Sequence, residues 1–563
     1  MQLASARHTA GSRPARAASP WRRASMLVAA LVALPVLGLA SQAIGGSSGL
    51  WPHLVANVLP VALRDTLILL AGVALVAGLL GVSLARLVTA YEFPGRGVLE
   101  WALLLPLAVP TYIIAYAYLD LLHPVGAFQG AIRALLGYAS PRDFRLPDIR
   151  SMPGCIVLLG LVLYPYVYLT TRVMLLTQSG NLVDAARTLG GSPRGVFWRV
   201  TLPLARPAVA VGVSLALMEA LNDIGASEFL GVRTLTVSIY TTWVTRSDLP
   251  GATQIALLLL FLVIALVSFE RWARRRQSFS ASGGRNPPAP AIRIGGAGGI
   301  ALLLLGSLPV LLGFVVPATH LAREAWRRIA FAGISPRLAG EAVSTLTFAG
   351  TATLVTLLLG LVVATASRLA PGRGTSWAQR LATMGYAAPG TVVAIGVLVV
   401  LGAFDQLIDR TAQHWLGVST GLLLMGSGAA LVYAYVVRFM AISTGSIEAG
   451  LARIPRSLDH ASRTLGRTTR RTLVEIHLPL SKAALAAGAL LVFVDCVKEL
   501  PATLLLRPLN VETFATHLYG EAARGTYEEA SIAALAIVAV GLLPVIVLAR
   551  VGRTRIPKQR GAS

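Results

Sequence analysis

The chain has 563 residues, of which 55% are hydrophobic and only 13% are charged, and its formal net charge is +24. Water-soluble domains usually have about 25% charged residues, so the composition argues against a soluble enzyme, and the apolar excess excludes a disordered chain. One chain cannot hide this much apolar sequence from water, so the excess is expected to face lipid. Cys155 and Cys496 lie in apolar runs and suggest neither a disulfide framework nor a thiolate metal site.

Twelve apolar runs are long enough to cross a bilayer as helices, the conformation that satisfies each backbone group within its own segment. The first run follows a basic arm, so a signal peptide ending near Ala43 is an alternative interpretation of it. The predicted fold class is an all-α integral membrane protein with about 12 transmembrane helices. In chain order the expected spans lie near 26–43, 66–85, 99–121, 155–174, 205–223, 252–270, 299–318, 343–367, 381–402, 419–437, 483–497 and 531–549.

Most of the 49 lysines and arginines fall in alternate loops. Cytosolic loops of membrane proteins are basic, so this pattern explains the net charge without nucleic acid and predicts that both termini are cytosolic. The basic segments are an arm at 1–25, a loop at 172–206, a linker at 271–298, a loop at 438–482 and a tail at 551–563.

The linker at 271–298 is basic and rich in Ser, Gly and Pro, and it divides the spans six and six. It separates a first transmembrane domain, 26–270, from a second, 299–550. The two domains resemble each other, because Leu182–Leu204 and Leu458–Leu480 are identical at ten of 23 positions. An even number of spans in each half makes the repeats parallel, with any substrate path expected at their interface.

Each repeated loop is expected to form two short helices joined at a glycine, Gly190 in the first loop and Gly466 in the second. The first loop combines these residues with Asp184, Ala185, Ala186, Leu202 and Pro203, and the second places His460, Ala461, Leu478 and Pro479 at the same spacing. This pattern resembles the "EAA" loop of permease subunits of ATP-binding-cassette importers. The second loop departs from it at His460 and Ser462, which puts in doubt a charge pair with a partner on that side.

The resemblance implies a type I importer fold with two homologous six-helix halves, whose two loops couple to two ATPase subunits. ATP and Mg would then bind on those partner subunits, and this chain would be a translocation subunit rather than an enzyme. A Walker A loop needs a Gly-Lys pair, and none of the three lysines, Lys482, Lys498 and Lys558, follows a glycine.

Four carboxylates occupy matched positions near the ends of two spans. Glu219 and Asp223 close the fifth span, and Asp495 and Glu499 close the eleventh. A spacing of four predicts each pair on one helix face, near the outer half of the membrane. They either line the route of a cation or form structural pairs with Lys498 and nearby arginines. As hard oxygen ligands they suit ferric iron, although no residue spacing indicates a fixed metal site.

The segments Met218–Trp243 and Val492–Ala522 resemble fused ferric-iron permeases of bacterial importers. That resemblance implies a multi-pass protein of the bacterial inner membrane, with a periplasmic binding protein delivering Fe³⁺. Within the same class, thiamine or a phosphonate is the alternative substrate. The rival from another class is a proton-driven transporter of six plus six helices, and a membrane-embedded enzyme fits least. Tyr240, Trp243 and Arg246 are interpreted mainly as interfacial belt residues.

Overall fold

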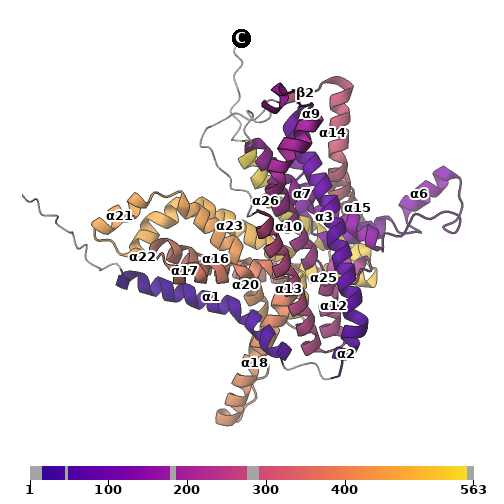
Figure 1. Cartoon of the computed structure of the whole chain (residues 1–563). Coiled ribbons are helices and arrows are strands. Elements are labelled where there is room, and N and C mark those ends of the chain that lie inside the picture. The colour runs from indigo at the N-terminus through magenta and orange to yellow at the C-terminus, as the bar shows by residue number, and fades with distance from the viewer. Residues whose placement is uncertain (1–14, 45–48, 178–184, 275–290, 554–563) are drawn as a thin grey trace, which may run out of the picture.

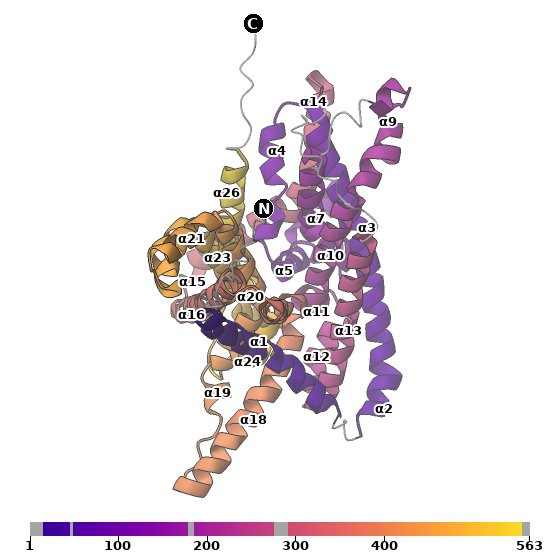
Figure 2. The same cartoon turned by 60° about the vertical axis from the view of Figure 1, so that its left-hand side comes forward.

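Long apolar helices make up nearly all of the computed structural model, which describes residues 15–44, 49–177, 185–274 and 291–553. Within these ranges, eleven helices are long and apolar enough to cross a membrane, or twelve if one bent pair counts as a span. The all-α prediction is confirmed, and Figures 1 and 2 show the helices of the first and second halves crossing at the centre of the molecule.

The first half comprises α1 (Ala15–Ile44), α2 (Trp51–His53), η1 (Leu54–Val58), α3 (Leu59–Ala90), β1 (Tyr91–Glu92), α4 (Arg96–Ala102), η2 (Leu105–Ala108), α5 (Thr111–Leu121), α6 (Ala127–Leu136), α7 (Met152–Thr177), α9 (Pro193–Val196), η3 (Phe197–Thr201), α10 (Leu202–Asn222), α11 (Gly225–Phe229), α12 (Leu235–Tyr240), η4 (Thr241–Thr245) and α13 (Leu249–Arg274).

The second half comprises β2 (Ile292–Arg293), α14 (Gly296–Val310), η5 (Leu311–Val315), α15 (Val316–Ala332), α16 (Pro336–Leu369), α17 (Arg373–Ala382), η6 (Met384–Ala387), α18 (Gly390–Leu416), α19 (Leu423–Gly426), α20 (Ala429–Ala452), α21 (Arg456–Thr464), α22 (Thr469–Thr472), η7 (Leu473–His477), α23 (Leu478–Lys498), α24 (Pro501–Leu506), α25 (Phe514–Arg524) and α26 (Tyr527–Arg553).

Three predicted spans differ clearly from the structure. The segment expected as a straight span at 99–121 is broken, because η2 and α5 meet at a bend of 90°. Pro106 and Pro110 lie at this bend, and a proline lacks the N–H that would continue a helical ladder. In the second half, α18 continues to Leu416 instead of ending near 402, and α20 begins only at Ala429.

The first helix of each half packs on the other half. α1 lies along α16, α17 and α18, and Gly38 of α1 faces Val400 of α18 so closely that an added Cβ would clash. Reciprocally, Gly306 of α14 faces Leu99 of α4. Small residues of this kind let helix backbones approach where lipid provides no hydrophobic force between them. The two halves are therefore interlocked.

A two-stranded parallel sheet joins the two halves next to the linker. β1 pairs with β2, with Tyr91 opposite Ile292 and Glu92 opposite Arg293. The Arg293 guanidinium also forms an ion pair with the Glu92 carboxylate at 2.9 Å. The second half of the chain therefore begins beside the end of α3 in the first half.

Candidate substrate path and repeated loops

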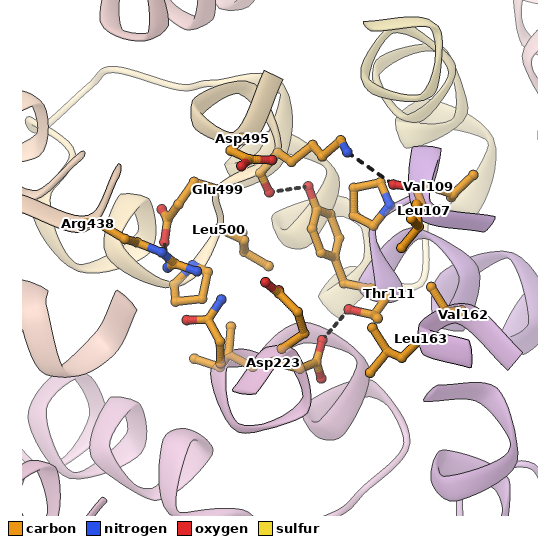
Figure 3. Close-up of a pocket in the computed structure, with 18 of the residues that line it drawn as sticks. Leu107, Val109, Thr111, Val162, Leu163, Asp223, Arg438, Asp495, Glu499 and Leu500 are labelled. Atoms are coloured by element: carbon orange, nitrogen blue, oxygen red, sulfur yellow. Dashed lines mark hydrogen bonds and ion pairs between the residues drawn. The ribbon is translucent and has the colours of Figure 1, made fainter. Parts of the chain in front are cut away.

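A cavity of about 150 Å³ lies where the two halves meet (Figure 3). α10 and α23 end beside it, and the bent segment that begins α5 lines it from the first half. The four carboxylates predicted from the sequence are all brought together here, and they line the cavity as Glu219, Asp223, Asp495 and Glu499.

The prediction that each carboxylate pair shares one helix is wrong. α10 ends at Asn222, and Asp223 is in an extended conformation that caps the next helix, α11. Its carboxylate accepts hydrogen bonds from the Ser227 backbone N–H at 2.8 Å and from the Thr111 hydroxyl at 2.6 Å. Asp223 therefore stabilises the helix break.

Glu499 repeats this arrangement in the second half. α23 ends at Lys498, and Glu499 is extended. Its carboxylate accepts hydrogen bonds from the backbone N–H groups of Ala502 at 2.9 Å and Thr503 at 3.0 Å, and from the Thr503 hydroxyl at 2.8 Å. The contacts of Asp223 and Glu499 at the helix breaks therefore fit the structural role that was one of the two alternatives for these acids.

Glu219 and Asp495 are different. Each lies one turn before the break, one on α10 and one on α23, and both line the cavity. Within the described part of the chain, neither carboxylate takes part in a hydrogen bond or a close ion pair. They interact electrostatically with Arg438 and Lys498. Glu219 and Asp495, one from each half, thus face the cavity without a direct polar partner among the described residues.

Arg438 and Lys498 are the two cations of the cavity. The Arg438 guanidinium pairs with the Glu499 carboxylate at 2.8 Å, and the Lys498 ammonium donates to the Leu107 carbonyl of the first half at 3.1 Å. Arg438 was expected in a basic loop, but it lies within α20, one residue beyond a predicted apolar run. Four carboxylates against two cations leave the cavity formally negative.

An aromatic cluster joins the halves on the side of the cavity away from the repeated loops. Tyr519 of α25 stacks on Phe229 of α11 with ring centroids 5.6 Å apart, and Tyr240 packs edge-on against it at 6.2 Å. The Tyr519 hydroxyl donates to Glu228. Burial raises the pKa of the Glu228 carboxyl, and this hydrogen bond lowers it in part. Tyr240, interpreted as a belt residue, thus packs between the halves, which are in contact here.

The glycines of the repeated loops adopt the predicted backbone. Gly190 has φ +84° and Gly466 has φ +71°, in the left-handed region that favours glycine. After them, η3 and η7 are matching π-helical turns that run into Leu202-Pro203 and Leu478-Pro479. A proline has no N–H to donate to the preceding turn, so a widened turn is expected where each loop continues into the next long helix, α10 or α23. Asp184 lies outside the described residues, and Ala185 is exposed.

The second loop contains an acid, Asp459, that the alignment of the two loop sequences did not identify. His460 of α21 is exposed, whereas its neighbour on the same helix, Asp459, is buried. The Asp459 carboxylate pairs with Arg368 at 2.9 Å and with His477 at 2.7 Å. Burial raises the pKa of Asp459, but the hydrogen bonds from Arg368 and His477 outweigh it and hold that pKa below its usual range. This acid anchors the loop internally.

Both loops expose a leucine at the same repeat position. Leu189 is 88% exposed and Leu465 is 77% exposed, each one residue before the loop glycine. Figures 1 and 2 show α9 and α21, which mark the two loops, at well-separated ends of the molecule. Sequence reasoning did not single out these leucines, although their identity at a constant offset was a signal.

Comparison with known proteins supports the repeat. Residues 77–278 and 356–556 each match the family described as binding-protein-dependent transport system inner membrane component. The chain is also similar to the Fe(3+)-transport system permease protein FbpB 2 of Haemophilus influenzae, at 23% identity over 86% of this chain and 89% of the relative.

Two further relatives match over about a third of the chain. The putative 2-aminoethylphosphonate transport system permease protein PhnU of Salmonella typhimurium is 30% identical over 35% of this chain and 69% of its own length. The molybdenum transport system permease protein ModB of Escherichia coli is 28% identical over 35% of this chain and 84% of its own length. These relatives are named as permeases of transport systems for different substrates.

Proposed function

The chain belongs to the family of binding-protein-dependent transport system inner membrane components, and we propose that it is the permease of an ATP-binding-cassette importer in a bacterial inner membrane, with both termini cytosolic. In this proposal the cavity between the halves is the substrate path. A periplasmic binding protein delivers the substrate to the side away from the repeated loops. Two partner ATPase subunits, which bind ATP and Mg, drive the cycle from the cytosol.

The repeated loops support coupling to two partners. Each half presents a short helix, a left-handed glycine and an exposed leucine at equivalent positions. Exposed large apolar side chains at matched sites suit insertion into two similar clefts. Because Asp459 is engaged within the chain, the second loop would dock through apolar contacts and His460 rather than through an acid.

We propose Fe³⁺ as the substrate. The observation that carries this is the pair Glu219 and Asp495, one carboxylate from each half, facing the cavity without a hydrogen-bond partner among the described residues. Carboxylate oxygens are ligands that hard, highly charged cations prefer. Groups of three or more ligating His, Cys, Asp or Glu side chains are absent from the described residues, which suits transient passage rather than storage. The similarity to a Fe(3+)-transport permease extends over 86% of the chain.

An oxyanion such as a phosphonate is the second candidate. Arg438 and Lys498 give the cavity two cations, and relatives named for phosphonate and molybdenum transport match at 28–30% identity. Against this, Arg438 already pairs with Glu499, and the acids outnumber the cations. The net charge therefore favours a cationic substrate.

Coupling follows from how the halves meet. The aromatic cluster around Tyr519 joins the halves, while α9 and α21 are well separated (Figures 1 and 2). In the proposed orientation the cluster faces the periplasm and the two repeated loops face the cytosol. When ATP draws the ATPase subunits together, the loops approach each other. The halves then separate at the aromatic cluster, and the cavity opens toward the binding protein. ATP hydrolysis reverses the movement and releases the cargo inward.

The test is uptake by proteoliposomes that contain this chain with its ATPase subunits. Ferric-loaded, thiamine-loaded and phosphonate-loaded binding proteins are compared with and without ATP. We expect ATP-dependent entry of iron alone, and at least a tenfold loss in the double variant Glu219→Gln, Asp495→Asn with binding-protein-stimulated ATPase activity retained. Asp223→Asn with Glu499→Gln is the matched control, and should lower thermal stability more than the first pair does. Uptake that follows a pH gradient without ATP would refute the importer assignment.

A further inference from the structure

Two tyrosines line the cavity between the halves together with its two unpaired carboxylates. Tyr166 comes from α7 of the first half and Tyr386 from η6 of the second half. Each tyrosine interacts electrostatically with both Glu219 and Asp495, and Tyr166 also interacts with Tyr386. The four side chains therefore form one cluster, to which each half contributes one tyrosine and one carboxylate.

The hydroxyl groups of Tyr166 and Tyr386 are not used within the protein. Tyr112 lines the same cavity, and its hydroxyl donates to the Lys498 carbonyl at 3.3 Å, as is usual for a buried phenol. Among the described residues, the hydroxyls of Tyr166 and Tyr386 have no hydrogen-bond partner, yet both oxygen atoms remain accessible. Both phenols are therefore available to a group that enters the cavity.

A second cavity, of about 20 Å³, adjoins this cluster and has room for about one water molecule. Tyr166, Glu219 and Tyr386 line both cavities. The smaller one is also lined by Leu215 and Met218, which precede Glu219 on α10, the helix that runs from the first repeated loop to the large cavity. The two tyrosines thus lie where the large cavity continues toward the repeated loops.

The formal charge of the large cavity gives the phenols a role when a trivalent cation enters. Its four carboxylates and two cations sum to −2, so Fe³⁺ would change the total to +1. An uncompensated charge at membrane depth is costly. Loss of one phenol proton brings the total to zero, and the phenolate oxygen that results is a hard ligand, the kind that a hard cation prefers.

We propose that Tyr166 and Tyr386 bind Fe³⁺ in transit together with Glu219 and Asp495, and that one of the two phenols binds as a phenolate. This site rests on the proposed function, because it takes Fe³⁺ as the substrate. A ligand must be deprotonated to bind the metal, so one phenol loses its proton to water in the cavity and regains a proton from water when the ion leaves. The iron stays ferric throughout.

Release follows from the division of the ligands between the halves. Tyr166 and Glu219 belong to the first half, and Tyr386 and Asp495 belong to the second. A movement of one half against the other therefore separates one pair of oxygen ligands from the other pair. The ion is then held by half of its protein ligands, beside the smaller cavity on the repeated-loop side.

A neutral phenol could instead donate a hydrogen bond to an oxyanion, so the experiment detects the phenolate itself. The complete transporter in nanodiscs is titrated with ferric nitrilotriacetate, and visible absorption is recorded. Phenolate bound to Fe³⁺ gives an intense visible charge-transfer band, which carboxylate and water ligands do not give. We expect this band in wild type and at least a tenfold loss of it in the double variant Tyr166→Phe, Tyr386→Phe.

The control is Tyr91→Phe with Tyr138→Phe, which removes two phenols outside the cavity and should keep the band within twofold of wild type. In proteoliposomes, ATP-driven iron uptake should fall tenfold or more in the cavity variant. Stimulation of ATP hydrolysis by ferric-loaded binding protein should stay within twofold of wild type. Phenylalanine keeps the ring packing and neither hydroxyl has a hydrogen bond to lose, so the Tm should not change.

Three results would overturn the tyrosine ligands and leave the proposed function intact: a full band in the cavity variant, no band in a wild-type transporter that imports iron, or loss of uptake with a lowered Tm, which would make the tyrosines structural. Failure of the wild-type transporter to import iron from any ferric-loaded binding protein would overturn both. Import of a phosphonate that falls in the cavity variant would assign the phenols to an oxyanion and would also overturn both.

Discussion

Replacing Asp459 with Ala should destabilise the second repeated loop strongly. The Asp459 side chain is 9% exposed, and its partners Arg368 and His477 are 10% and 0% exposed. Removing one partner of a buried pair costs about 3–5 kcal/mol, because the remaining charge stays buried. Arg368 retains hydrogen bonds to the carbonyl oxygens of Leu451 and Ile454, so we expect a value near the lower end, about 3 kcal/mol.

The assay is thermal unfolding of the purified chain at one scan rate, with Glu475→Ala as the control. Glu475 pairs with Arg471 at 2.6 Å but is 42% exposed, so its loss should cost at most about 1 kcal/mol. Because the pKa of Asp459 is lowered in the folded state, its contribution is complete above the unfolded value of about 3.9 and disappears as the pH falls through the folded value. Equal Tm values for the two variants at pH 7 would refute the anchoring role.

Two other changes test the repeated loops and the contact between α25 and α16. Gly466→Val places a β-branched residue at φ +71°, which costs about 1–2 kcal/mol in the left-handed region, and it should uncouple ATP hydrolysis from uptake while membrane insertion persists. Gly445→Ala, in open space on α20, is the control. His517→Gln removes an ion pair with Glu341 at 3.0 Å. The hydrogen bond to Glu341 raises the pKa of His517, so its stabilisation is complete below about 6.5 and is lost as the pH rises through the folded value.

One outcome for each variant would contradict these predictions. Normal coupling in Gly466→Val would mean that the loop tolerates a different backbone. A Tm difference between wild type and His517→Gln that grows with pH would contradict the raised pKa.

The sequence predicted the helices, the repeat and the meeting of four carboxylates, because apolar length and polar loop motifs are local signals. It did not predict that Asp223 and Glu499 cap the following helices, since a carboxylate at a helix end has the same spacing as one within the helix. Nor did it predict the role of Asp459, which is aligned with Val183 and acts through His477 and through Arg368, a residue distant in the chain. Contacts of this kind depend on tertiary packing.

The repeat also shows why the cavity is asymmetric. At the offset of 276 residues, Arg438 corresponds to Val162 and Lys498 to Asn222, and all four residues line the cavity. Both cations therefore come from the second half, and each lies beside acids of both halves.

Replacing Arg438 with Val, its counterpart in the first half, should separate the two candidate substrates. Glu499 keeps its hydrogen bonds from Ala502 and Thr503, so the helix break should survive, and breaking this buried pair should cost about 3 kcal/mol, near the lower end of the usual range. The cavity becomes more negative by one charge. A cation would then be held more tightly and released more slowly, so that iron uptake per ATP falls although loaded binding protein still stimulates hydrolysis. An oxyanion would instead lose one of its two cations and fail to enter. Faster iron uptake in this variant would show that Arg438 obstructs the path rather than balancing its carboxylates.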